Sequence, residues 1–155
     1  MVRLVEAIPL AHEPFAPFGE VVAHAGVAPR HYLRVPFQRD PNASRPEFWV
    51  TRAAESRRLP LRVTTLERHR FSAQTFIPLR VRRYLVVVAP NAADGFPDLS
   101  ELRAFVANGG QGVSYRPGTW HQGLTVLDDA GEFAVMMSMT GNGDDEFWGV
   151  PTPID

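Results

Sequence analysis

The chain has 155 residues, with 16 basic and 17 acidic side chains and a formal net charge of −1. This balance argues against a nucleic-acid-binding surface, which needs a basic excess or stripe, and the short runs "SRRLPLR" and "RVRR" are expected to be solvated strand ends. The sequence contains no cysteine, which excludes disulfides, zinc–thiolate sites and thiol nucleophiles.

The length fits one domain spanning residues 1–155. The N-terminal stretch "MVRLVEAIPLAHEPF" is too polar and too interrupted for a secretory signal. The longest apolar run, "YLVVVAP", is too short to span a bilayer. We therefore expect a cytoplasmic protein whose partners do not include a membrane or a nucleic acid.

Short strands are predicted along most of the chain, because runs rich in β-branched and aromatic residues alternate with Gly, Pro, Asn and Asp. They span residues 19–24, 48–53, 61–69, 74–79, 83–89, 112–116, 119–127 and 132–140. The run "YLVVVA" at 84–89 predicts a central strand buried on both faces. The irregular stretch 35–47 predicts a surface loop or flap within the domain.

The best helical candidate is "DLSELRAFV", residues 98–106, where Asp98 can cap and Glu101 follows three residues later. It spans at most two turns, and "RAFV" could already be strand. Eight or more short strands with one or two short helices indicate an all-β sandwich or barrel, a class that includes jelly rolls.

Five histidines are present, and three of them stand alone in N-terminal or loop-like contexts: His12, His24 and His31. For these three we expect surface or locally hydrogen-bonded side chains. His69 differs, because Glu67 lies two residues before it and would share its face on a strand. Gln74 opens the next predicted strand and could face back toward the pair.

His121 follows a Pro-Gly turn signal in "RPGTWHQGL". It is either a packed histidine at a hairpin tip or part of a pocket rim. Two stretches fall at the spacing of the two metal-binding motifs of cupin barrels. Glu67, His69 and Gln74 stand at the His, His and Glu positions of the first motif. Residues at the spacing of the second motif are Gly110, Arg116, Gly118, His121 and Thr125, with Arg116 in place of a Pro and Thr125 in place of an Asn.

The chain resembles the ureidoglycolate lyase family in "FAPFGEVV", "LERHRFSAQTFIPL" and "DLSELRAFVANGGQGVSYRPGTWHQGL". The resemblance implies a cupin-like jelly-roll β-barrel, usually a homodimer, that cleaves ureidoglycolate to glyoxylate and urea in allantoin breakdown. It also implies a divalent metal, Ni²⁺ in some members. The chain departs from the family pattern at Ser72-Ala73-Gln74 and at Gln122-Gly123, and it lacks an Asn-x-Gly segment followed by Arg in its N-terminal half.

Cleavage of ureidoglycolate, a small-molecule substrate, needs a base for the hydroxyl proton and an acid for the departing nitrogen. His69 and His121 can titrate near neutral pH, and Glu67 is predicted to orient His69. Gln74 is assigned to the ureido or carboxylate group. Arg116 is assigned to the substrate carboxylate, with a solvated turn residue as the alternative. Trp120 is assigned to the substrate pocket, with core packing as the alternative.

A second interpretation gives Glu67, His69, Gln74 and His121 to a divalent ion such as Ni²⁺, Zn²⁺ or Mn²⁺. Because the set carries one carboxylate and two imidazoles, we expect weak binding and an easily lost metal. Two other functions remain open. One is a non-catalytic cupin that binds and senses a small acid, and the other is a different metal-dependent cupin enzyme, such as an isomerase or dioxygenase.

Overall fold

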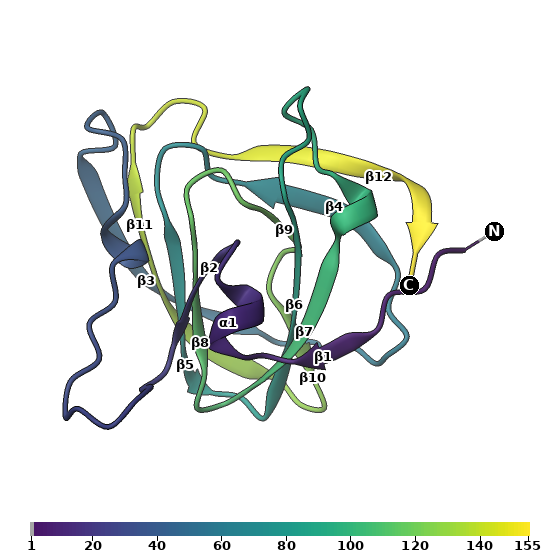
Figure 1. Ribbon diagram of the computed structural model, residues 1–155, viewed down its shortest axis with the longest axis horizontal. Helices are drawn as coiled ribbons and strands as arrows, with labels where there is room; N and C mark the ends of the chain where they lie inside the picture. The colour runs from purple at the N-terminus through teal and green to yellow at the C-terminus, as the bar shows by residue number, and fades with distance from the viewer. Residues whose placement is uncertain (1) are drawn as a thin grey trace.

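A computed structural model describes residues 2–155 and shows two stacked β-sheets (Figure 1). The seven-stranded sheet has the order β1 (Ala7–Pro9), β7 (Arg103–Asn108), β6 (Arg83–Ala89), β9 (Trp120–His121), β4 (Val63–Arg68) and β12 (Glu146–Ile154), with β10 (Thr125–Leu127) paired to β6. The five-stranded sheet has the order β2 (Gly19–Val22), β8 (Gly112–Tyr115), β5 (Gln74–Arg80), β11 (Gly131–Met139) and β3 (Arg45–Ala53). The predicted all-β, cupin-like fold is confirmed. The two sheets form a barrel that hydrogen bonds between strands do not close.

The main core lies between the two sheets and is rich in aromatic residues. Phe105 of β7 meets Phe15 edge-on, with ring centroids 5.7 Å apart and planes at 89°. Strand β6 lies in the middle of its sheet, and six of its seven residues are buried. The expectation of a central strand buried on both faces is therefore confirmed.

Helices are short: α1 covers His12–Phe15, and two 3₁₀ turns cover Val35–Phe37 and Leu99–Glu101. Asp98 caps the last of these, because its carboxylate accepts a hydrogen bond from the Ser100 backbone N–H at 3.0 Å. The helix predicted for 98–106 ends after this turn, since the rest is strand β7, paired between β1 and β6. Among residues 2–155, no helix combines the length and apolar character needed to cross a membrane.

The sequence pattern does not predict β1 or β12, and it allows either helix or strand for the start of β7. β12 contains Gly149, Pro151 and Pro153, which argue against a central strand. These residues are tolerated because β12 lies at the edge of the sheet, where β4 is its strand partner and an isolated bridge joins Ile154 to Arg3. Its register with β4 is irregular between Gly149 and Ile154. The predicted loop 35–47 also ends early, because β3 begins at Arg45.

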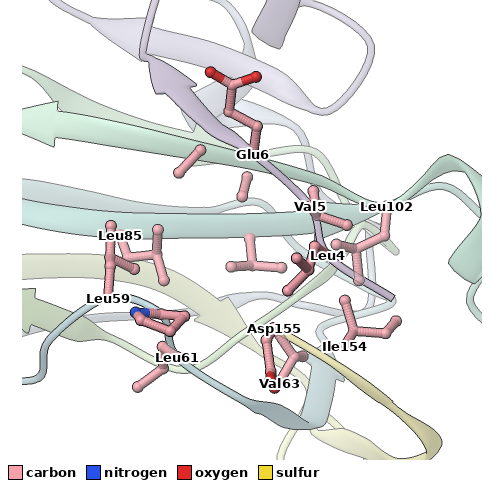
Figure 2. Close-up of a pocket in the computed structure, with 14 residues that line it drawn as sticks. Leu4, Val5, Glu6, Leu59, Leu61, Val63, Leu85, Leu102, Ile154 and Asp155 are labelled. Atoms are coloured by element: carbon pink, nitrogen blue, oxygen red, sulfur yellow. The ribbon is translucent and has the colours of Figure 1, made fainter. Parts of the chain in front are cut away.

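A second core covers the outer face of the seven-stranded sheet. It surrounds an apolar hollow of about 530 Å³, which Leu59 and Leu61 line on one side and Leu4 and Val5 on the other, while the Glu6 carboxylate points away (Figure 2). The two chain ends meet beside it, and the Val5 N–H donates to the Asp155 carbonyl at 2.9 Å. This second core fastens the chain ends to the sheet.

The register between strands brings polar residues from both sheets to one place. In the seven-stranded sheet, Glu67 of β4 stands directly opposite His121 of β9. In the five-stranded sheet, Gln74 of β5 stands opposite Tyr115 of β8. Tyr115 also contacts His121 across the gap between the sheets. The predicted site residues therefore meet where the two sheets face each other.

Candidate active site

Glu67, His69 and His121 form one cluster, in which each residue offers a ligand atom and all three atoms lie within 4.8 Å of one another. Glu67 and His121 come from paired strands. His69 is the first residue after β4, and its ring centroid is 5.3 Å from that of His121. The sequence prediction that these side chains share one site agrees with this geometry.

His121 is 1% exposed and held on two sides. Its Nδ1 donates to the Thr119 carbonyl at 3.0 Å, and the Tyr115 ring stacks on it. Its Nε2 lies 3.4 Å from Glu67 Oε1, within reach of charge attraction but without the geometry of a hydrogen bond. A bound proton or a cation at Nε2 would satisfy both atoms.

His69 is oriented by Asp145, not by Glu67 as the sequence suggested. The Nδ1 of His69 lies 2.9 Å from Asp145 Oδ1. Residues i and i+2 of a strand lie on the same face, and Glu67 and His69 do lie close together. However, β4 ends at Arg68, and Glu67 stands opposite His121 on the paired strand β9. The carboxylate of Glu67 therefore acts on the other imidazole.

Three buried polar atoms in the site have no hydrogen-bond partner within the described chain: His69 Nε2, His121 Nε2 and Gln74 Oε1. The Gln74 side-chain amide is otherwise held by a weak contact from its Nε2 to Met137 Sδ at 3.8 Å. Buried polar atoms are normally paired, and an unpaired cluster indicates a missing ligand, ion or water. Two imidazole nitrogens, a carboxylate and an amide oxygen fit a borderline divalent cation.

Burial and charge shift two of the site's pKa values. Burial lowers the pKa of His69, and the nearby His121 lowers it further, against the opposing charges of Glu67 and Asp145. Burial raises the pKa of Glu67, but His121 and the charge of His69 outweigh it and leave that pKa below its ordinary value. Near neutral pH the cluster therefore holds a neutral His69 and an ionised Glu67.

A cavity of about 510 Å³ opens beside the cluster. Its lining residues come from β3, β4, β5, β11 and the segments next to them: Glu47, Trp49, Glu67, His69, Gln74, Met137, Met139 and Asp145. Three of the eight are acidic, and none is Lys or Arg. The volume suits a small molecule, and the convergence of titratable groups distinguishes this cavity from the apolar hollow in Figure 2.

Arg116 and Trp120 do not line this cavity. The Arg116 guanidinium donates to the Ala16 carbonyl at 3.2 Å and lines a separate hollow. Trp120 is 2% exposed and belongs to the second core. Consecutive strand residues point to opposite faces, so the strand that turns His121 toward the site turns Trp120 away from it. The packing interpretation of Trp120 agrees with this position.

Two of the remaining histidines make local hydrogen bonds, as expected. His24 Nε2 lies 2.7 Å from the Ala28 carbonyl, and His31 Nδ1 accepts from the Ala25 N–H at 3.0 Å. His12 is half-buried, with its ring centroid 5.5 Å from that of His31. These side chains lie outside the cavity.

Several residues of the site were missed from sequence: Glu47, Trp49, Tyr115, Met137, Met139 and Asp145. Asp145 lies in the acidic run "GDDE", which carries no spacing signal because 76 residues separate it from His69. Trp49 had been assigned only to a strand. Its position at the cavity follows from the pairing of β3 with β11.

Comparison with known proteins gives a consistent result. The sequence profile of ureidoglycolate lyase matches residues 2–150. A ureidoglycolate lyase of Pseudomonas aeruginosa is 38% identical over 157 residues, covering 93% of this chain and 89% of the relative. One from Schizosaccharomyces pombe is 36% identical over 152 residues, covering 81% and 79%. One from Burkholderia cepacia is 39% identical over 137 residues, covering 82% and 75%. The profile match and these relatives show that the chain belongs to the ureidoglycolate lyase family.

Proposed function

We propose that this protein is an enzyme, a ureidoglycolate lyase that cleaves ureidoglycolate to glyoxylate and urea. Membership of the family supports the substrate. The observation that carries the chemistry is the meeting of His69 Nε2, His121 Nε2 and the Glu67 carboxylate beside a small cavity, with neither Nε2 engaged in a hydrogen bond within residues 2–155.

The reaction breaks the bond between the carbinol carbon and the ureido nitrogen. The hydroxyl loses its proton, its oxygen becomes the aldehyde oxygen of glyoxylate, and the electron pair of the C–N bond leaves with the nitrogen. That nitrogen takes up one proton and becomes urea. The enzyme must therefore supply one base and one acid, and no net proton is consumed.

His69 is suited to act as the base. Its Nδ1 proton is engaged by Asp145, and its lowered pKa keeps the ring neutral with a free lone pair on Nε2. His121 is assigned the role of the acid, because its Nε2 lies 3.4 Å from the Glu67 carboxylate, which attracts positive charge at this nitrogen. A positioned acid or base contributes about 10²- to 10⁴-fold in rate.

Gln74 is the proposed substrate contact. Its Oε1 is buried and lacks a partner within the described residues, so it can accept a hydrogen bond from a ureido N–H. Arg116 is not placed to hold the substrate carboxylate, because its side chain lines another hollow. A bound cation would supply positive charge at the cavity, whose eight lining residues include no Lys or Arg.

The absence of Lys and Arg from the eight lining residues favours a second candidate, a metal-assisted lyase. Glu67, His69 and His121 would hold a divalent ion, with Gln74 as a fourth ligand, and Ni²⁺ is the ion implied by family resemblance. When bound, the ion would supply a Lewis acid for the substrate's oxygen atoms. One carboxylate among the ligands is consistent with weak, exchangeable binding.

Incubation with racemic ureidoglycolate tests the proposal. We expect glyoxylate to form catalytically with the wild-type protein and far more slowly with Glu67→Gln, which keeps the side-chain shape but removes the charge beside His121. Tight binding of ureidoglycolate without glyoxylate release would instead indicate a protein that senses a small acid. Oxygen consumption during turnover would indicate a dioxygenase.

The proposed homodimer has its strongest support at β3. This edge strand exposes three large apolar side chains in succession, Phe48 at 67%, Trp49 at 39% and Val50 at 61%. Exposed apolar edge strands favour pairing with another strand, and two copies of one strand pair antiparallel about a twofold axis. Sedimentation should give twice the 17.3 kDa chain mass, and Val50→Lys should give the monomer. A wild-type monomer at working concentration would refute the dimer.

A further inference from the structure

The hydrogen bond between His69 and Asp145 determines which ring nitrogen of His69 is free. The two atoms, Nδ1 and Oδ1, are 2.9 Å apart. An ionised carboxylate can only accept a hydrogen bond, so the proton of a neutral His69 sits on Nδ1. Nε2 then carries a bare lone pair and has no partner among residues 2–155.

His121 has the same arrangement with a different partner. Its Nδ1 donates to the Thr119 carbonyl, a backbone group that no side-chain substitution removes. The tautomer of a histidine is set by the hydrogen bond made at its other nitrogen. Of the two site histidines, His69 is therefore the one whose tautomer depends on a single replaceable side chain.

Asp145 is held in place by the turn that precedes it. The neighbouring Asp144 is 7% exposed and accepts three hydrogen bonds, from Thr140 N at 2.7 Å, Thr140 Oγ1 at 3.0 Å and Gly141 N at 2.7 Å. Gly141 and Gly143 have φ values of 85° and 65°, which favour glycine. The turn is thus fixed by its own contacts, and its last residue reaches His69.

Residues on both sides of this contact are also paired. Glu146, next to Asp145, forms ion pairs with Arg68 and with Arg70, the latter at 2.7 Å, and these two arginines flank His69. Glu146 and Arg68 stand opposite each other in the β12–β4 ladder. Glu146, the residue after Asp145, is therefore paired with the residues on both sides of His69.

We infer that Asp145 is a positioning residue that keeps the His69 proton on Nδ1 and leaves Nε2 free for the cavity. An imidazole without such a partner prefers its proton on Nε2 in water, which would block the lone pair. The same free nitrogen serves either as the proposed base or as a metal ligand. The effect on turnover rests on the proposed function, whereas the tautomer does not.

Nitrogen NMR of the ¹⁵N-histidine-labelled protein tests the tautomer directly. The His69 signals are assigned by their loss in His69→Gln. We expect wild-type His69 to be the Nδ1–H tautomer, Asp145→Asn to retain it through its amide oxygen, and Asp145→Leu to shift the ring toward Nε2–H. A wild-type His69 protonated on Nε2, or an Asp145→Leu spectrum unchanged at His69, overturns the inference.

Kinetics provide the second readout. Asp145→Leu should lower kcat for glyoxylate release about 10- to 100-fold, the usual cost of losing a residue that orients a site histidine, with KM changed much less. Asp145→Asn should recover most of the loss.

Asp129→Leu is the matched control, because Asp129 is exposed and only pairs with Arg82 at 3.7 Å. Equal losses in the Leu and Asn variants would contradict a tautomer-based role. Absence of turnover in the wild type would refute the proposed function and leave the NMR result to decide the role of Asp145.

Discussion

The ring of Tyr115 lies flat against the ring of His121, with centroids 4.1 Å apart and planes 11° apart. The two residues belong to different sheets, Tyr115 to β8 and His121 to β9. The stack therefore joins the sheets at the site and, with the Thr119 carbonyl, fixes the imidazole. The Nε2 of His121 lies beside Glu67, 3.4 Å from Oε1.

Replacing this imidazole should abolish most turnover. His121→Ala removes the proposed acid, so kcat for glyoxylate release should fall about 10²- to 10⁴-fold while circular dichroism shows a retained β fold. His24→Ala is the control, since His24 is exposed and bonds only to the Ala28 carbonyl. If His121→Ala loses solubility but the surviving protein keeps its specific activity, His121 is a packing residue.

Stability should depend on pH through His69. Its pKa is lowered in the folded state from the ordinary 6.5, so the unfolded chain takes up a proton first as pH falls. The free energy of unfolding should therefore decline as pH drops from 6.5 toward the folded-state pKa, and the decline stops below that pKa. Urea unfolding of metal-free protein, compared with His69→Gln, measures this effect.

The His69→Gln variant should show a shallower decline in that pH range. Glu67 acts in a lower range. Its pKa lies below 4.5 in the folded state, so its stabilising contribution is lost only as pH falls through that lower value. An unchanged pH dependence in His69→Gln would show that His69 is not neutral in the folded protein.

Metal removal separates the two accounts of the chemistry. His69 and His121 cannot transfer protons at Nε2 while ligating an ion there. Under the acid–base account, protein treated with a chelator and then dialysed should retain most of its turnover, and added Ni²⁺ should inhibit. Loss of activity on chelation that Ni²⁺ restores, measured by glyoxylate release, would favour the metal-assisted account.

Close approach of β2 and β8 predicts a stability effect at Gly19. A Cβ at this position would lie 1.8 Å from the Ser114 carbonyl oxygen, so Gly19→Ala forces the strands apart. We expect a loss of about 1–3 kcal/mol in the free energy of unfolding, as for other overpacked sites. Gly149→Ala is the matched control, because a Cβ at this edge-strand position meets nothing within 4 Å. Equal stability of the two variants would contradict the described β2–β8 packing.

The strands with strong alternation or continuous apolar runs could be predicted from sequence, as β6 and β11 illustrate. β12 could not, because its prolines are compatible with a strand only at a sheet edge, and edge position is a tertiary property. A helix was predicted where β7 begins, because Asp98 gives a capping signal. In the structure Asp98 caps only one 3₁₀ turn. Pairing with β6 then decides the conformation of the following residues.

In the candidate site, too, residues in local motifs could be predicted and their tertiary partners could not. Glu67, His69, Gln74 and His121 were identified from spacing, and the structure brings Glu67, His69 and His121 together and places Gln74 at the same cavity. Their partners could not be identified, because Asp145 and Tyr115 reach the histidines across strand pairings that no local pattern encodes. Arg116 illustrates the converse: motif spacing fixed its position in the chain, but not the direction of its side chain.

The identity of the nitrogen product tests the central claim most directly. Elimination at the carbinol carbon needs only one base and one acid, the roles proposed for His69 and His121, and it releases urea. Hydrolysis of the ureido carbonyl would release ammonia and needs an activated water and oxyanion stabilisation; the chain has no Cys and no nucleophile-elbow Ser motif. In a urease-free preparation given racemic ureidoglycolate, the account predicts urea and glyoxylate in equal amounts. Ammonia rising with glyoxylate while urea stays absent would contradict it.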